Sequence, residues 1–441
     1  MLPSYKKIWE ISGPMMLGLL AENIVGVVDT AFLGHVGELE LAASAIASTF
    51  FIILFLVGLG FGVGTQILIA RRNGEKNYGQ IGGIYENSLY FICFYSAVMI
   101  LISFLFSRKI LGFMLNSEEI VNTAMQYLNI RIFSLVFALG CVIMRSFFIG
   151  IQLTKYIGIG ALIVAGTNFV MDYLLIFGKF GFPEMGLKGA ALACVFAEFA
   201  GFIFYVIIII RKIDLAKYRM FTFRKPQMKI IKQTLSLSIF TMFQNLISLS
   251  SWFIFFVLIE KTGEKNLATA NIIRSYYVLV LCPAWAFGSA VSTLVSHAIG
   301  ANQRRHVFPI IRRVAVFGLI TSAVTFIPTL ISAKGIMSLY TDSAELIEMG
   351  FKSLYVVGVA NILSAAVWVL FSAISATGNT MIALFVEAFT LVCYLSSVYY
   401  FAKYFPTRVE IIWCSEFVYQ ILLGLISILY LRTNHWKKKI I

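Results

Sequence analysis

Residues 37–74, GELELAASAIASTFFIILFLVGLGFGVGTQILIARRNG, recur in diverged form at residues 263–300, GEKNLATANIIRSYYVLVLCPAWAFGSAVSTLVSHAIG. The two segments lie 226 positions apart, and each begins with Gly-Glu and ends with Gly. The same offset places Thr154 on Thr380 without a gap. Further identical pairs are Leu41-Ala42 with Leu267-Ala268, Ile46 with Ile272, and Gly62 with Gly288. We therefore interpret the chain as two copies of one unit.

The composition indicates a membrane protein, because 60% of the 441 residues are hydrophobic and only 13% are charged. A helix needs about 20 apolar residues to cross a bilayer. The first apolar segment is too long for a signal peptide, and it contains Glu22 and Asp29, so we expect it to be retained. The sequence predicts an all-α polytopic membrane protein with twelve transmembrane helices in two six-helix parallel repeats around a central cleft. The predicted helices are 11–33, 45–70, 84–106, 122–150, 157–178, 186–210, 230–259, 267–298, 307–332, 346–375, 381–403 and 409–431.

One long polar connection divides the predicted helices into two bundles. We expect an N-lobe at 1–210 (helices 1–6), a cytoplasmic linker at 211–229, and a C-lobe at 230–441 (helices 7–12) with a basic C-terminal tail. Each bundle crosses the membrane an even number of times. The two copies are therefore expected to be parallel repeats related by an axis along the membrane normal, with a substrate path between them.

The net charge of +14 reflects membrane topology rather than nucleic-acid binding. If both termini are cytoplasmic, 22 of the 35 lysines and arginines lie on the cytoplasmic side and 10 on the other, with Arg131, Arg145 and Arg274 inside helices. An excess of basic residues on the cytoplasmic side is the usual rule. We predict a protein integral to the plasma (bacterial inner) membrane, with both termini in the cytoplasm, that contacts anionic lipids and no nucleic acid.

Two carboxylates lie at one predicted depth in the first copy. Asp29 is four residues before Leu33, about 6 Å from the expected outer end of helix 1, and Asp172 is about 9 Å from the outer end of helix 5. Asn168 lies one turn from Asp172 on the same helix face. Tyr127, near the start of helix 4, is expected at a similar level. The 226-residue offset places Phe255 and Val398 opposite the two acids, so the second copy lacks this pair.

A buried acid inside a bilayer costs about 2.5–3.5 kcal/mol on insertion scales and calls for a function. Apolar surroundings and a second nearby carboxylate both favour the protonated form of a carboxyl group. The cluster of Asp29, Asp172, Asn168 and Tyr127 is therefore a candidate site for coupling to H⁺, or to Na⁺ through oxygen ligands. The alternative is structural: Asp29 caps its helix, and Asp172 and Asn168 make ordinary interhelical hydrogen bonds.

Other residues in predicted helices have less specific interpretations. Glu22, two turns below Asp29, lines the same cavity or packs against a neighbouring helix. Pro14 makes a static kink or a hinge in helix 1. The glycines of helix 2 favour close helix packing. Glu198, Glu387 and Glu416 have no obvious acidic partner at their level and are interpreted as ion pairs or cavity lining. We expect no metal site and no cofactor beyond the coupling ion, H⁺ or Na⁺; the six cysteines have no metal-ligand spacing.

These features together resemble the multidrug and toxic compound extrusion (MATE) transporters over essentially the whole chain. The stretch DTAFLGHVG, residues 29–37, is similar to the helix 1 motif of the DinF-like branch. Residues 62–74, with Gln66, Ala70 and Arg71, look like the helix 2 signature, and Asn168 to Asp172 looks like the helix 5 pattern.

The resemblance implies efflux of small organic, often cationic, compounds in exchange for H⁺ or Na⁺ by alternating access, by a protein expected to act as a monomer. It places Asp29, Tyr127, Asn168 and Asp172 in the N-lobe coupling site of the family, and Pro14 at a bending position of helix 1. The sequence departs from the pattern of the family at two places. The level of helix 6 that faces the site holds Gly186 and Ala190 instead of a hydroxyl residue, which favours H⁺ over Na⁺. Helices 7 and 10 lack the acids of another branch, so we expect no cation site in the C-lobe.

Three other classes compete with this interpretation. A flippase for lipid-linked oligosaccharide or a related lipid precursor would need basic groups for phosphate, and the acids in the predicted helices outnumber the arginines. A membrane enzyme would need metal-spaced histidines or a nucleophile with a base, and the sequence has neither. A channel fits a two-lobed repeat less well than alternating access does.

Overall fold

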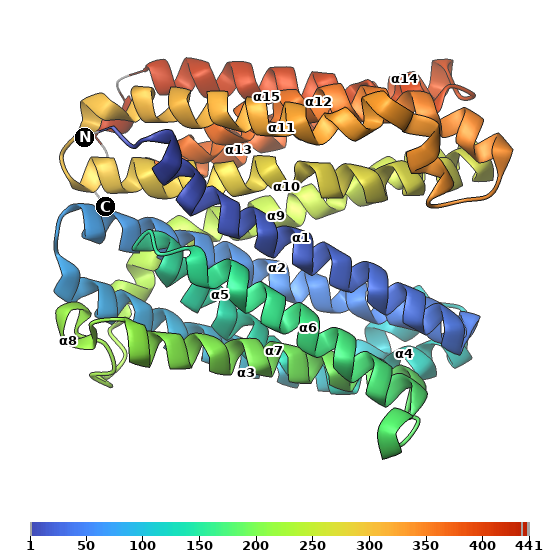
Figure 1. Ribbon diagram of the computed structural model, residues 1–441, viewed down its shortest axis with the longest axis horizontal. Coiled ribbons are helices and arrows are strands. Elements are labelled where there is room, and N and C mark those ends of the chain that lie inside the picture. Colours follow the sequence, from blue (N-terminus) through green and yellow to red (C-terminus); the bar gives the residue numbers. More distant parts are fainter. Residues whose placement is uncertain (1, 434, 439–441) are drawn as a thin grey trace. The chain divides into compact units, whose positions relative to one another are not determined.

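The computed structural model describes residues 2–433 and 435–438, and this part of the chain is helical, with no strands (Figure 1). Of the predicted basic tail, Lys439 lies outside the described residues. The long helices of the first copy are α1 (Tyr5–Val36), α2 (Glu38–Gly74), α3 (Tyr78–Met114), α4 (Glu118–Arg131), α5 (Ser134–Gly150), α6 (Lys155–Phe177) and α7 (Gly186–Lys212). Those of the second are α9 (Met228–Glu260), α10 (Glu264–Gly300), α11 (Val307–Ser338), α12 (Ala344–Ala376), α13 (Thr380–Tyr404), and the short α14 (Val409–Trp413) continued by α15 (Ser415–Arg432).

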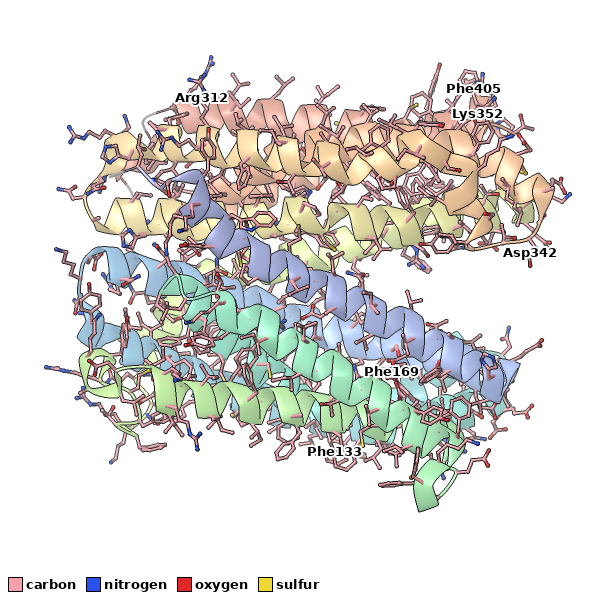
Figure 2. All side chains as sticks on the ribbon, viewed as in Figure 1. Phe133, Phe169, Arg312, Asp342, Lys352 and Phe405 are labelled. Atoms are coloured by element: carbon pink, nitrogen blue, oxygen red, sulfur yellow. The ribbon has the colours of Figure 1, made fainter. Side chains whose placement is uncertain are left out.

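The helices confirm the predicted membrane fold. Within the described residues, eleven helices are long and apolar enough to cross a bilayer, and the bent pair α4 and α5 makes a twelfth span. Large apolar side chains such as Phe133 and Phe169, labelled in Figure 2, are 50% and 51% exposed. Half-exposed phenylalanines on apolar spans are expected to face lipid. The chain is therefore an integral membrane protein.

One predicted helix is wrong in detail: the segment 122–150 is two helices that meet at an angle of 49°. The break falls at Ile132 and Phe133, without a proline. The hydroxyl of Ser134 donates to the carbonyl of Arg131 at 2.7 Å, and the N–H of Phe133 donates to Ile130, three residues back. A side chain that takes a backbone acceptor and a tightened last turn together end α4.

The two copies begin alike. Gly37 precedes α2 and Gly263 precedes α10 as the N-terminal cap residue, and each ends the short connection from the preceding long helix. Gly263 has φ +130°, a conformation that residues with a Cβ rarely adopt. Packing, however, divides the chain differently from the repeat. One unit is Leu17–Met242; the other runs from Phe243 onward and includes the chain up to Met16. The helices α1 and α9 therefore each contribute to both units.

The glycines of α2 provide close helix packing in the Leu17–Met242 unit, as predicted. A Cβ placed on Gly58 or Gly62 would collide with Leu139 or Val142 of α5. On the other face, a Cβ on Gly60 would lie 2.8 Å from the backbone of Met242 in α9. Alternate glycines thus let α2 approach two helices at once.

The linker between α7 and α9 is fixed to the end of α3. It contains the short helix α8 (Leu215–Tyr218). The buried carboxylate of Glu86 accepts from the N–H of Thr222 at 2.7 Å, and the side chain of Asn87 accepts from the N–H of Gln227 at 2.6 Å. These bonds satisfy backbone donors of residues 220–227, the part of the linker after α8, which forms no helix or strand.

Candidate functional site

The structure brings Asp29 of α1 and Asp172 of α6 together inside the Leu17–Met242 unit. The carboxyl groups lie within hydrogen-bonding range of each other. Asp172 is fully buried, and Asn168, one turn away on α6, is 2% exposed. Helix α1 continues to Val36, three residues beyond the predicted end, so Asp29 lies about 10 Å from that end and Asp172 about 8 Å from the end of α6. The two acids therefore share a level.

One amide connects the two carboxylates. With its nitrogen turned toward the acids, the side chain of Asn168 lies 2.8 Å from Oδ1 of Asp29 and 3.2 Å from Oδ2 of Asp172. The opposite orientation would face the amide oxygen toward acceptors only, so the hydrogen-bond network selects this one. Oδ1 of Asp172 is buried and accepts no hydrogen bond. The two acids thus share the amide as a hydrogen-bond donor, and Oδ1 of Asp172 remains available to a proton.

Cys194 of α7 is the residue that sequence reasoning missed at this site. Its Sγ lies 3.8 Å from Oδ2 of Asp29, and the thiol is 4% exposed. The sequence placed the facing level of this helix at Gly186 and Ala190. Cys194 continues that face by one more turn, because residues four apart align on a helix. The spacing indicates the helix face on which Cys194 lies, but a cysteine without metal-ligand spacing gives no signal of a functional role.

Tyr127 contacts neighbours of the acid pair rather than the two carboxylates themselves. It is buried in α4, with its hydroxyl within hydrogen-bonding range of Ser48 and of Cys194. Arg131, one turn further along α4, stacks over Phe51, with the guanidinium carbon 4.6 Å from the ring centre. Its charge acts on Asp29 at longer range, without an ion pair. The acids therefore sit near a cation that does not neutralise them by direct contact.

The remaining candidates of the first copy lie outside this cluster. Glu22 forms an ion pair with Arg145 of α5, so it contacts a basic partner rather than the acid pair. Glu198 of α7 lies within electrostatic range of Arg131 and Arg145. Pro14 lies inside α1, which remains helical through it, two residues before the division between the units. In the part of the chain that the structure describes, no group of three or more His, Cys, Asp or Glu is arranged to hold a metal ion.

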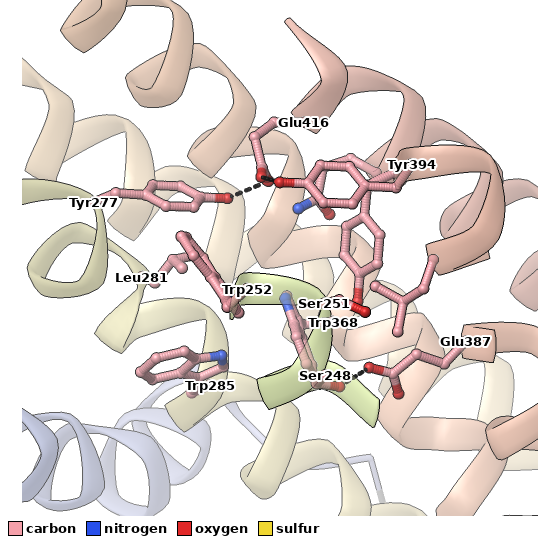
Figure 3. A pocket seen from close by; sticks show the side chains of 13 residues that line it. Ser248, Ser251, Trp252, Tyr277, Leu281, Trp285, Trp368, Glu387, Tyr394 and Glu416 are labelled. Atoms are coloured by element: carbon pink, nitrogen blue, oxygen red, sulfur yellow. Dashed lines mark hydrogen bonds between the residues drawn. The ribbon is translucent and has the colours of Figure 1, made fainter. Parts of the chain in front are cut away.

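The second copy has no acid at the equivalent positions, as its sequence requires: Phe255 and Val398 are both fully buried in apolar packing. It does, however, bring two other acids together. Glu387 of α13 and Glu416 of α15 line one cavity of about 150 Å³ (Figure 3). The expectation that these glutamates have no acidic partner is therefore wrong. Their side chains come from different helices, so no spacing within one helix could reveal the pairing.

Up to twelve apolar spans in the described residues, a duplicated unit and paired acids inside one copy define an integral membrane protein of the transporter class. The sequence model of the family described as MatE matches residues 14–174 and again residues 241–400. The chain belongs to the multidrug and toxic compound extrusion (MATE) family. The two matched ranges end 226 residues apart, which is the offset of the repeat.

Curated relatives and solved structures agree with this assignment. The probable multidrug resistance protein NorM of Thermotoga maritima is 25% identical over 98% of this chain and 93% of its own length. The multidrug export protein MepA of Staphylococcus aureus is 23% identical over 86% of this chain and 82% of its own length. The fold matches the outward-facing conformation of a multidrug resistance MATE family transporter with a TM-score of 0.91, at 19% identity, over 98% of this chain and 97% of that one.

Proposed function

We propose that this protein exports small organic, often cationic, compounds in exchange for protons by alternating access, and that it is a transporter rather than an enzyme. The family and the names of its relatives, which are multidrug resistance and export proteins, support efflux. The observation that carries the coupling is the pair formed by half-buried Asp29 and fully buried Asp172 around the amide of Asn168. We further propose that it acts as a monomer in the plasma membrane, with both termini in the cytoplasm.

The composition of the site favours H⁺ over Na⁺. A sodium ion is hard and requires several oxygen ligands, whereas thiols suit soft metals. The α7 residue beside Asp29 is Cys194, and the amide of Asn168 directs a nitrogen donor at both carboxylates. A proton needs no coordination shell. It can be held between two carboxyl groups that lie within hydrogen-bonding range.

Protonation would couple to conformation through the charge between α1 and α6. When both acids are ionised, like charges repel across the contact; one proton removes this repulsion and adds a hydrogen bond. An ion shifts a conformational equilibrium only by as much as it binds the two states differently. Because α1 contributes to both packing units, a change in its contact with α6 is able to bias the access state.

A proton-release measurement tests this coupling. Exchange requires that substrate binding lowers proton affinity, and this linkage is reciprocal. Adding tetraphenylphosphonium to the purified protein in weakly buffered solution should release protons, detected with an indicator dye. The release should disappear in Asp29→Asn, while Glu345→Gln, at an exposed ion pair with Lys265, should behave as wild type. Equal release from Asp29→Asn and wild type would contradict the assignment.

A flippase for lipid-linked precursors is not supported by the side chains that line the cavity of the second copy. Such a ligand carries phosphate, which basic side chains recognise. The cavity of the second copy is lined by two glutamates and, among the described residues, by no lysine or arginine.

A further inference from the structure

The cavity of the second copy is lined by counterparts of residues that surround the acid pair of the first, but not by Phe255 or Val398, the counterparts of the acids themselves. The 226-residue offset places Tyr394 on Asn168 and, continued into the next helix, Gln420 on Cys194. Glu416 falls on Ala190, so an acid stands where the first copy has a methyl group. The duplicated scaffold therefore provides a related cavity with different chemistry. Its aromatic walls are Trp252, Tyr277, Trp285, Trp368, Tyr394 and Tyr419 (Figure 3).

The cavity holds two carboxyl groups and no basic side chain among the described residues. Both carboxylate oxygens of Glu416 accept from tyrosines: Oε2 from Tyr277 at 2.8 Å and Oε1 from Tyr394 at 3.0 Å. Glu387 accepts from the hydroxyl of Ser248, and it is 1% exposed. Tyr419 lies within interaction range of both carboxylates. No lysine, arginine or histidine of the described chain lines this space.

Two buried oxygen atoms in the lining have unmet hydrogen-bonding capacity. Oε1 of Gln420, a residue 1% exposed, has no hydrogen-bond partner. Oε2 of Glu387 accepts no hydrogen bond of standard geometry, although Gln244 and Tyr419 lie near enough to interact with the carboxylate. Buried polar atoms are normally paired, so two open acceptors on one cavity indicate a missing donor. A cation that carries N–H groups would supply both charge and donors.

We propose that this cavity is a binding site for a small organic ammonium compound of about one aromatic ring in size. Its volume of about 150 Å³ suits such a guest, since an apolar cavity of that volume accepts benzene. Tryptophan and tyrosine faces attract organic cations, and the attraction increases when the site is dry. A sodium ion would gain nothing from six aromatic walls. Binding at this site stands on its own; that the bound cation is the exported substrate rests on the proposed efflux function.

The test compares two probes of equal shape on the purified full-length protein in detergent. Benzylammonium and benzyl alcohol differ in charge but have the same number of heavy atoms. Binding is followed by intrinsic tryptophan fluorescence, because three tryptophans line the cavity. Benzylammonium should bind saturably and about tenfold or more tightly than benzyl alcohol, the factor expected when a charged hydrogen bond is lost. NaCl should not compete more strongly than KCl at equal ionic strength.

Variants locate the binding in this cavity. Glu416→Gln and Glu387→Gln preserve shape and should each weaken benzylammonium binding about tenfold or more, with little effect on benzyl alcohol. Glu345→Gln, at the exposed ion pair with Lys265 in the same packing unit, is the matched control and should bind as wild type. Thermal unfolding of each variant establishes that it is folded. If Glu416→Gln is unstable, Trp252→Phe and Trp252→Ala replace it: the first should retain most of the affinity and the second should lose it.

Unchanged benzylammonium affinity in folded Glu387→Gln and Glu416→Gln would overturn the proposal, as would equal binding of the two probes or displacement by Na⁺ alone. This equilibrium measurement uses no gradient. A protein that binds benzylammonium through the two glutamates but shows no proton-driven efflux would retain this site and refute the proposed function. Proton-driven efflux without charge-selective binding would refute this site and retain the proposed function.

Discussion

At the scale of single residues, the acid pair of the first copy is held without an ion pair. Asp172 is fully buried, and its contacts are a carboxyl group and an amide rather than a base. A carboxylate in the bilayer interior costs about 2.5–3.5 kcal/mol on insertion scales, and nothing in direct contact offsets the full charge of both acids. Such a pair is poorly suited to stabilising a fold. It is well suited to taking up one proton.

Asp29→Asn should abolish coupled efflux and leave the protein inserted and folded. The substitution removes the ionisable group but also removes a desolvation cost, so the thermal unfolding temperature should be unchanged or higher. Efflux from proteoliposomes and thermal unfolding in detergent are measured on the same preparation. Wild-type efflux by correctly folded Asp29→Asn would remove this residue from the coupling site.

Asp172→Asn and a change at its counterpart in the second copy should have different effects. We expect Asp172→Asn to impair coupling, because the proton would no longer be shared between two acids. Val398→Ile or Phe255→Leu, at fully buried apolar positions, should change only packing or the range of substrates. Coupled transport is measured for all three variants. Loss of coupling in Val398→Ile with normal coupling in Asp172→Asn would move the site out of the first copy.

The residues of the acid site in the first copy could largely be predicted from the sequence, but the contacts between their side chains could not. The four-residue spacing of Asn168 and Asp172 fixes a common helix face, and distances to helix ends give a common depth for Asp29. That the amide of Asn168 points at both carboxylates depends on the packing of α1 against α6. The spacing from Gly186 and Ala190 places Cys194 on the facing side of α7, but only the tertiary packing of α7 shows that this turn meets Asp29.

At the scale of helices, α2 is held by contacts that only glycine permits. Gly60→Ala would place a Cβ 2.8 Å from the backbone of Met242, which cannot move aside as a side chain could. We expect this substitution to destabilise the protein by about 1–3 kcal/mol, the usual cost of overpacking. The matched control is Gly26→Ala in α1, where a Cβ would meet no atom within 4 Å. Thermal unfolding should distinguish them, and equal stability would contradict the close packing.

Helix number and type followed from apolar length alone, since every backbone group inside a bilayer must be satisfied within its own helix. The end of α4 did not follow. Ser134 bonds the carbonyl of Arg131, and a serine at such a position is compatible with an unbroken helix as well. Whether the helix ends at this serine or continues depends on the helices that pack around it.

At the scale of the whole molecule, the topology prediction concerns the linker and the termini. Single cysteines at Lys217 and Gly181, in a background without the exposed Cys93, should react differently with a membrane-impermeant thiol reagent added to intact cells. Only the cysteine at Gly181 should be labelled, because the excess of basic residues places the linker in the cytoplasm. Both should react after permeabilisation. Labelling at Lys217 in intact cells would reverse the orientation.

The sequence predicted only part of the difference in acidic residues between the two copies. The offset showed which acids the second copy lacks, because that comparison needs only Phe255 and Val398. It did not reveal that Glu387 and Glu416 share one cavity, because α13 and α15 bring them together through tertiary packing. We expected no cation site in the C-lobe because predicted helices 7 and 10 lack acids. Glu387 and Glu416 lie instead in predicted helices 11 and 12.

The central claim is that protons drive this transporter through the first copy. The most direct measurement is efflux of a lipophilic cation from proteoliposomes under separately imposed pH and Na⁺ gradients. A pH gradient in Na⁺-free buffer should drive transport by wild type, and the same gradient should fail with Asp172→Asn. A Na⁺ gradient that drives transport by wild type, while a pH gradient does not, would contradict the account.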